Sequence, residues 1–313
     1  MRVYRWDLDK TYLHTDFESV RGLMRSAVES ARDKRAVAGA PTLLRELARE
    51  RPGWRPRVML LSGSPTQMRG VLEAKLRMDG IRFDQFILKD NLANLRRGRL
   101  RAMRDQFGYK LPHLLLDRVG VGAVVRETCF GDDAEADAIV YSVYADAVAG
   151  RIASAELSRV LEAAGAYPNS IVEALSTLKQ IVRAEAVERI FIRLDRGEDR
   201  RDFTPLGTRV IPVRTWFEAA LVLCGSGELD GEAFARVYAA SRLGEGDAKE
   251  GVRRMLERGA VNMDVARRVL ALVDDPGLTA ATALLHEGDW AYRPPAPAPG
   301  MDYLELVRGF KRR

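Results

Sequence analysis

Four short apolar segments of the chain end in residues that can hold metal ions or phosphate groups. The segments are residues 2–6, 57–61, 83–89 and 126–130, and each has the length of a buried β-strand. The polar residues at their ends are, in chain order, Asp7 and Asp9, Ser62 and Ser64, Lys89 and Asp90, and Asp132, Asp133 and Asp137. Neighbouring carboxylates repel each other unless a cation or a proton neutralises them. The pattern therefore raises the hypothesis of a site built around a cation.

These residue types suit the chemistry of phosphate esters. A cluster of carboxylate oxygens is a ligand set that fits Mg²⁺. An aspartate can attack phosphorus to form an aspartyl-phosphate, provided that a second acid or base serves the leaving oxygen. A hydroxyl group and a lysine hold the transferring phosphoryl oxygens, and a metal ion neutralises their charge. The chain supplies each of these parts.

Helices between the strands must position these residues. The periodicity of apolar residues predicts further strands at 188–194 and 209–213, and helices at 17–32, 41–50, 65–79, 110–118, 135–148, 154–164, 168–186 and 215–224. Alternating strands and helices predict an α/β fold with a Rossmann-like parallel sheet and helices on both faces. Ligands of such sheets bind at the carboxyl ends of the strands, so the polar residues are expected to converge there.

The chain after residue 225 is expected to be helical. Helices are predicted at 230–242, 247–258, 262–274 and 277–286, and Asp230 and Asn262 are expected N-caps. A Pro-rich spacer follows, and the chain ends in "GFKRR". We therefore predict three parts, which are an α/β domain over 1–225, a helical region over 226–293, and a Pro-rich spacer with a basic tail over 294–313.

Composition limits the classes of protein that are compatible with the chain. The net charge of +6 permits anionic partners without requiring them. Cys129 and Cys224 lie in no CxxC or Cys/His cluster, so buried free thiols are expected rather than a disulfide framework or a zinc site. The first strand begins too early for a signal peptide, and no apolar run is long enough to span a membrane. A cytoplasmic protein is expected, with at most peripheral contact to an anionic membrane.

The motifs resemble those of the haloacid dehalogenase superfamily of phosphatases. The stretch "DLDKT" at 7–11 is similar to the DxDxT signature of that superfamily, and Ser62 matches its second motif. Lys110 in "YKLPHLL" has the position of the third-motif lysine, and "GDDAEAD" at 131–137 matches the acidic fourth motif. The stretches "LLSGSP", "LKD", "YKLPHLL" and "GDDAEADAIVY" more narrowly resemble the catalytic domain of the actin-patch phosphatidate phosphatase family and its bacterial relatives.

The resemblance implies a role for each motif residue. Asp7 would be the nucleophile, and Asp9 the general acid that later activates water. Ser62 and Lys110 would hold the phosphoryl group. The implied Mg²⁺ ligands are the Asp7 side chain, the Asp9 main-chain carbonyl and Asp132, with Asp133 or Asp137 in support. Close relatives often have an acidic residue where this chain has Lys10, and we expect little effect of that difference on the chemistry.

Two assignments stay open at this point, and four more residues are candidates. Lys89 competes with Lys110 as the phosphate-binding lysine, and one of Asp133 and Asp137 can be a helix cap instead of a metal ligand. The candidates for contact with substrate are Thr11, Gly63, Ser64 and His14.

The expected function is Mg²⁺-dependent hydrolysis of a phosphomonoester through an aspartyl-phosphate. The segments 12–56 and 90–109 leave little room for the large cap that selects substrates in this superfamily, so an open site is expected. An open site suits bulky or surface-presented phosphates, such as those of lipid heads, proteins or nucleic-acid ends, and the resemblance suggests a phospholipid such as phosphatidate or another bulky phosphate. The alternatives are a nucleic-acid end phosphatase, suggested by the net charge of +6, and a non-catalytic metal-binding scaffold. The basic run 96–104 is either a solvated helix face or an anion-binding lip near the site.

Overall fold

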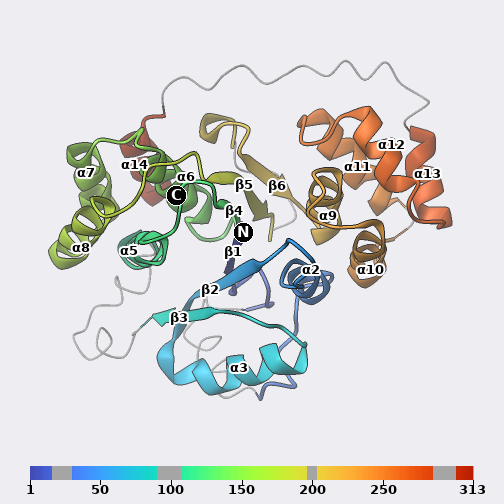
Figure 1. The fold of residues 1–313 in the computed structure, drawn as a ribbon, viewed down its shortest axis with the longest axis horizontal. Coiled ribbons are helices and arrows are strands. Elements are labelled where there is room, and N and C mark those ends of the chain that lie inside the picture. Colours follow the sequence, from blue (N-terminus) through green and yellow to red (C-terminus); the bar gives the residue numbers. More distant parts are fainter. Residues whose placement is uncertain (16–29, 90–106, 196–202, 245, 285–300, 313) are drawn as a thin grey trace.

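A six-stranded parallel sheet lies at the centre of the fold (Figure 1). The computed structural model describes residues 1–15, 30–89, 107–195, 203–244, 246–284 and 301–312. The strands are β1 (Arg2–Asp7), β2 (Pro56–Pro65), β3 (Gln85–Lys89), β4 (Arg126–Asp132), β5 (Val187–Arg193) and β6 (Val210–Val213). Their order is β3-β2-β1-β4-β5-β6. The expected α/β fold with an open, Rossmann-like parallel sheet is confirmed at this level.

Helices cover both faces of the sheet (Figure 1). One face packs against α5 (Phe107–Arg118), α6 (Asp137–Ala149), α7 (Ser154–Ala164), α8 (Pro168–Leu178) and α14 (Tyr303–Arg312). The other packs against α2 (Ala40–Leu47), α3 (Arg69–Met78) and α9 (Trp216–Gly225). Successive strand residues alternate between the two faces of the sheet. Trp6 and Leu60 pack on the face covered by α2, α3 and α9, and Met59 and Leu61 pack on the face covered by α5 and α6. By the same alternation Arg5 and Asp7 point toward α5 and α6.

The predicted C-terminal helices are present, and they extend the core around α9. They are α10 (Gly231–Ser241), α11 (Asp247–Glu257), α12 (Met263–Leu270) and α13 (Pro276–Leu284). The predicted N-caps are confirmed, because Asp230 accepts a hydrogen bond from Ala233 at 2.8 Å and Asn262 accepts one from Val265 at 2.9 Å. Buried residues of α10–α13 belong to the same apolar cluster as α2 and α9.

The basic tail is helical where the structure describes it. Helix α14 lies against α6 and α7, and the Tyr303 hydroxyl donates a hydrogen bond to Asp146 of α6 at 2.6 Å. Asp146 also accepts from Arg151 at 2.6 Å and Arg209 at 3.0 Å, so the contact is a charged one. No helix in the described part of the chain is long and apolar enough to cross a membrane.

Several predicted boundaries were wrong. Strand β2 does not stop before "SGSP" but continues through it to Pro65, with an irregular register between Ser62 and Pro65. The helix predicted at 168–186 ends at Leu178, because the chain then runs beside β4, where Ala186 accepts a hydrogen bond from Glu127. Cys129 is buried as predicted, whereas Cys224 is partly exposed. The helix predicted at 17–32 and the basic run 96–104 lie largely or wholly outside the described residues.

The strand order places a topological switch point between β1 and β4, and we call this position the crevice. The chain proceeds outward from β1 through β2 to β3 on one side, and from β4 through β5 to β6 on the other. The connections at the carboxyl ends of β1 and β4 therefore diverge, and this is where open α/β sheets bind their ligands. Asp7 ends β1 and Asp132 ends β4, so both lie at the crevice.

Candidate active site

Asp7 is the innermost acidic residue of the crevice. It is completely buried at the end of β1, and its Oδ1 accepts a hydrogen bond from the Lys110 ammonium at 2.8 Å. Its Oδ2 has no hydrogen-bond partner among the described residues, although it too is shielded from solvent. A buried carboxylate oxygen without a donor is costly, so this atom is where a cation or an electrophile fits.

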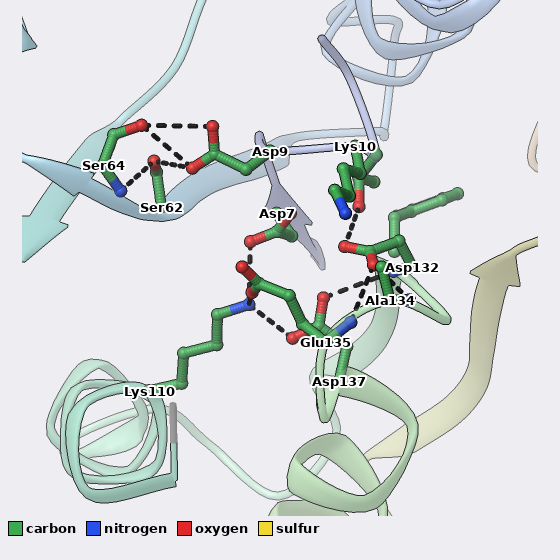
Figure 2. Close-up of polar contacts among 12 residues, drawn as sticks. Asp7, Asp9, Lys10, Ser62, Ser64, Lys110, Asp132, Ala134, Glu135 and Asp137 are labelled. Carbon is green, nitrogen blue, oxygen red and sulfur yellow. Dashed lines mark hydrogen bonds and ion pairs between the residues drawn. The ribbon is translucent and has the colours of Figure 1, made fainter. Parts of the chain in front are cut away.

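Lys110 joins three carboxylates from two segments (Figure 2). It projects from the first turn of α5, and its ammonium contacts Asp7, Glu135 at 2.9 Å, and Asp137. Burial alone would lower the pKa of Lys110, but these carboxylates outweigh it and raise that pKa. Lys89, the competing lysine, lies 5.9 Å from the centre of the Tyr109 ring at the end of β3. The geometry thus brings Lys110 to Asp7.

The turn after β4 folds Asp132 and Asp137 toward each other. Asp132 Oδ1 accepts hydrogen bonds from the backbone of Ala134 at 2.7 Å and of Glu135 at 3.0 Å, and the Asp132 backbone donates to Asp137 at 3.3 Å. Gly131 makes this approach possible, because a Cβ at that position would lie 2.5 Å from the Asp137 Cβ. The residue types of "GDDAEAD" therefore have a local role in shaping the turn.

Together these side chains form what we call the carboxylate cluster, which consists of Asp7, Asp132, Glu135 and Asp137 around Lys110 (Figure 2). Burial raises the pKa of Asp7, Asp132 and Asp137, and mutual repulsion adds to the rise while Lys110 opposes it. Four carboxylates face one ammonium, so the cluster carries an excess of negative charge when it is ionised.

The carboxylate cluster meets the requirements of a divalent metal site. One ligand oxygen from each of Asp7, Asp132 and Asp137 lies within 4.8 Å of the other two. The donor set is all oxygen, which suits Mg²⁺ better than zinc or copper. The unpartnered Asp7 Oδ2 and the surplus of negative charge are both features that a bound cation would relieve. The residues present therefore fit the metal that the motifs imply.

Asp9 lies on the other side of Asp7, held by two serines (Figure 2). The Ser62 hydroxyl donates to Asp9 Oδ2 at 2.6 Å, and the Ser64 hydroxyl donates to the same oxygen at 3.0 Å. Gly63 lies between the serines on the irregular end of β2. Burial raises the pKa of Asp9 to about 6, the charge of Glu135 adds to this rise, and the serine hydrogen bonds limit it. A carboxyl group in this range can both give and take a proton near neutral pH.

Three other predicted residues lie at the edge of the site. The side chain of Asp133 turns toward β5 and accepts a hydrogen bond from the Asp195 backbone at 2.8 Å, so it lies apart from the carboxylate cluster. The Thr11 hydroxyl donates weakly to Asp132 at 3.4 Å. His14 is exposed, and its pKa is lowered by partial burial and by the charge of Arg193.

Sequence reasoning missed Glu135, Arg193 and Tyr109. Glu135 stands within the quoted acidic motif, where its spacing from Asp132 and Asp137 is the only available signal. Arg193 ends β5 and donates a hydrogen bond to the carbonyl of Lys10, which adopts a left-handed conformation with φ +61°. Such a conformation is uncommon outside glycine, and Arg193 fixes it directly after Asp9. Tyr109 precedes Lys110 on α5.

A scan against protein-family models, a search of curated proteins and a search of solved structures each found no match to this chain.

Proposed function

We propose that this chain is a Mg²⁺-dependent phosphomonoester hydrolase that acts through an aspartyl-phosphate on Asp7. The observation that carries the proposal is the unpartnered, buried Asp7 Oδ2 within a cluster of surplus carboxylates at the crevice of the sheet. The resemblance to the haloacid dehalogenase superfamily supports the same conclusion from the motifs. In that reading the fold is of the haloacid dehalogenase type.

The first half of the reaction transfers the phosphoryl group to Asp7. An Asp7 carboxylate oxygen forms a bond to phosphorus while the bond from phosphorus to the ester oxygen breaks. Asp9 in its protonated form gives its proton to the leaving alcohol. The Lys110 ammonium and the Ser62 hydroxyl lie on either side of these two aspartates, where they can donate hydrogen bonds to the phosphoryl oxygens.

The second half of the reaction releases phosphate. Asp9, now a carboxylate, takes a proton from a water molecule. The oxygen of that water forms a bond to phosphorus while the bond from phosphorus to Asp7 breaks. The products are inorganic phosphate and the two aspartates in their starting protonation states. When bound, Mg²⁺ would be held by Asp7 and Asp132, supported by Asp137 and the Asp9 carbonyl, and would neutralise charge on the phosphoryl oxygens.

The substrate class follows from the surroundings of the crevice. Helix α2, within the insertion between β1 and β2, packs against α10 through the Glu46–Arg236 ion pair at 2.7 Å and the apolar residues Leu43 and Leu47. This part of the insertion belongs to the body of the fold, which supports a site without a large cap. A site without a large cap admits bulky phosphates. A phospholipid such as phosphatidate, reached from the cytoplasm by peripheral contact with an anionic membrane, is the substrate that the motifs favour.

The experiment that tests this function uses p-nitrophenyl phosphate with Mg²⁺ or with EDTA. We expect hydrolysis that requires Mg²⁺, and a loss on the order of 10⁴-fold or more in Asp7→Asn. Brief incubation with radiolabelled substrate and acid quenching should trap a phosphoprotein that hydroxylamine cleaves. Asp230→Asn is the matched control, because asparagine is an equally good N-cap and α10 lies far from the crevice.

The other functions predict different results. Full activity of Asp7→Asn, or activity without a trapped phosphoprotein, would exclude the aspartyl-phosphate. A scaffold would bind Mg²⁺ without hydrolysing any phosphomonoester. A panel of phosphatidate in detergent micelles, soluble phosphate esters and end-phosphorylated oligonucleotides then identifies the substrate class. An end phosphatase would prefer the oligonucleotides and would bind them in a strongly salt-dependent way.

A further inference from the structure

The Tyr109 hydroxyl is a buried donor without a partner at the edge of the crevice. The ring is partly exposed, yet its oxygen is shielded from solvent and makes no hydrogen bond within the described part of the chain. Buried tyrosine hydroxyls usually find a partner, because an unsatisfied donor retains its desolvation cost. Other buried polar atoms of the described residues also lack a partner, so the position of this hydroxyl decides what it can bind.

The surroundings of Tyr109 place this hydroxyl at the site. Tyr109 directly precedes Lys110 in the first turn of α5, and Lys89, at the end of β3, lies 5.9 Å from the ring centre. On its helix it packs edge-on against His113, with ring centres 5.0 Å apart. Burial raises the pKa of the Tyr109 hydroxyl, Lys110 opposes the rise, and the carboxylates of Asp7 and Asp9 add to it. The hydroxyl is thus within electrostatic reach of both reactive aspartates.

The chemistry of this position defines what it can bind. A neutral phenol with the Lys89 ammonium over its ring offers one hydrogen bond to an acceptor and repels no anion. Lys110 bonds to Asp7 Oδ1 and the serines bond to Asp9, whereas the Tyr109 hydroxyl bonds to neither aspartate, not even to the open Asp7 Oδ2. An anionic oxygen brought in by a ligand would satisfy the donor and would also meet the charges of Lys89 and Lys110.

We propose that the Tyr109 hydroxyl binds a phosphoryl oxygen of the substrate, with Lys89 providing positive charge behind the ring; this inference rests on the function proposed above. Tyr109 is then a substrate-binding residue that extends the phosphate site from Lys110 toward β3. The assignment also gives Lys89 a part in the site as a charged neighbour of Tyr109, without making it a substitute for Lys110.

Tyr109→Phe tests this inference because it removes one oxygen and nothing else. Loss of an unsatisfied buried hydroxyl should leave the melting temperature unchanged or higher. Loss of a hydrogen bond to a charged oxygen should weaken binding of inorganic phosphate, measured by calorimetry with Mg²⁺, by about 10- to 100-fold, with a matching fall in kcat/KM. Tyr238→Phe is the opposite control. Tyr238 lies on α10, and its hydroxyl donates a hydrogen bond to Asp275 at 2.8 Å. This variant should therefore lose stability and keep both activity and phosphate binding.

The possible outcomes separate this inference from the proposed function. If the wild type hydrolyses phosphate esters and Tyr109→Phe binds phosphate with unchanged affinity, the Tyr109 assignment is wrong and the function stands. If the wild type binds phosphate without turnover and Tyr109→Phe weakens that binding, the assignment stands and the hydrolase function is wrong. A wild type that neither hydrolyses esters nor binds phosphate overturns both.

Discussion

The elements β1, β4, α5 and α6 together build two buried charged clusters, which lie at successive positions along β1 and β4. At the carboxyl ends of β1 and β4, with the first turns of α5 and α6, they form the carboxylate cluster. Deeper in the fold they form a second group, here called the arginine cluster, in which Arg5 and Arg118, together with the partly exposed Arg57, surround Asp117 and Glu127. Each cluster thus draws on β1, β4 and α5, and α6 adds Asp137 to one and Tyr144 to the other.

The two clusters differ in charge balance. In the arginine cluster, Glu127 accepts hydrogen bonds from Arg5, from Arg118 at 2.7 Å and from Tyr144 at 2.8 Å. Every carboxylate oxygen of Asp117 and Glu127 therefore has a donor. In the carboxylate cluster, negative charge is in excess and Asp7 Oδ2 has no donor. Both clusters keep buried atoms without a hydrogen-bond partner in the described residues: Arg5 Nη2 and Arg118 Nε in one, and Asp7 Oδ2 in the other. What distinguishes the carboxylate cluster is the carboxylate oxygen without a donor together with the excess of negative charge, and a cation would relieve both.

Neutralising one carboxylate in each cluster should have opposite effects on stability. Glu127→Gln removes the carboxylate that pairs with the buried Arg118 and leaves Arg5 with Asp117 alone, so we expect the free energy of unfolding to fall by about 3–5 kcal/mol. Asp137→Asn reduces repulsion in the other cluster, so the metal-free protein should be as stable as the wild type or more so. Urea unfolding in EDTA measures both. Equal losses in the two variants would show that both clusters are structural.

Addition of Mg²⁺ should stabilise the protein through the carboxylate cluster alone. Mass action predicts a gain of about 2.7 kcal/mol at a free concentration one hundred times the dissociation constant. Asp132→Asn and Asp137→Asn should lose this gain, and Glu127→Gln should keep it despite its lower starting stability. Urea unfolding with and without Mg²⁺ provides the measurement. A gain that survives in Asp132→Asn would place the cation elsewhere on the molecule.

The convergence of the site could be predicted from the sequence because it follows from a general property of parallel sheets. Polar residues after buried strands meet at one edge, so Asp7 and Asp132 had to be neighbours once β1 and β4 were adjacent. The lysine was harder, because Lys89 and Lys110 both lie near that edge. Only the packing of α5 shows that Lys110 reaches Asp7.

The orientation of the acidic turn could not be read from the sequence. Asp133 and Asp137 are both aspartates of the same acidic motif, one and five residues after Asp132, and the residue type does not tell which of them faces the cluster. The backbone hydrogen bonds that Asp132 accepts curl the turn, so that Asp137 points back under Gly131 while Asp133 faces β5. These are effects of tertiary structure, since they depend on β5 already lying beside β4.

Two residues of the arginine cluster, Arg5 and Glu127, are charged residues within predicted buried strands, and only the structure identifies their partners. Arg5 and Glu127 stand inside strands that must be buried on both faces, and a charge in such a strand requires a partner. The need for partners was therefore predictable. Their identity was not, because Asp117 and Arg118 lie on a helix, distant from β1 in sequence.

Two arginines at opposite ends of β5 should separate function from stability. Arg193 donates a hydrogen bond to the carbonyl of Lys10, which has a left-handed backbone conformation directly after Asp9. Arg193→Gln removes this donor and should misplace Asp9, so kcat should fall by about 10- to 100-fold with little change in KM. Arg193→Lys should recover part of that loss. Arg189 contacts Glu228 at 2.7 Å at the amino end of the strand, so Arg189→Gln should lower stability and keep kcat. A fall in kcat of equal size in both variants would contradict a positioning role for Arg193.

The smallest expected effect is the pH dependence of the arginine cluster. Burial acts to raise the pKa of Glu127, but Arg5, Arg118 and the Tyr144 hydroxyl outweigh it and hold that pKa below its ordinary value of 4.5. A lowered carboxyl pKa contributes stability that is fully present above the unfolded-state pKa and is lost as the pH falls through the folded-state pKa. The difference in unfolding free energy between the wild type and Glu127→Gln should therefore be constant from pH 7 to about 5 and shrink below about 4.5. Urea unfolding over this range measures the difference, with the exposed Glu232→Gln as a control that should match the wild type throughout. A difference that stays constant into the acid range would mean that Glu127 stabilises the fold by its shape and hydrogen bonds, and that the charge balance which separates the two clusters contributes nothing at this position.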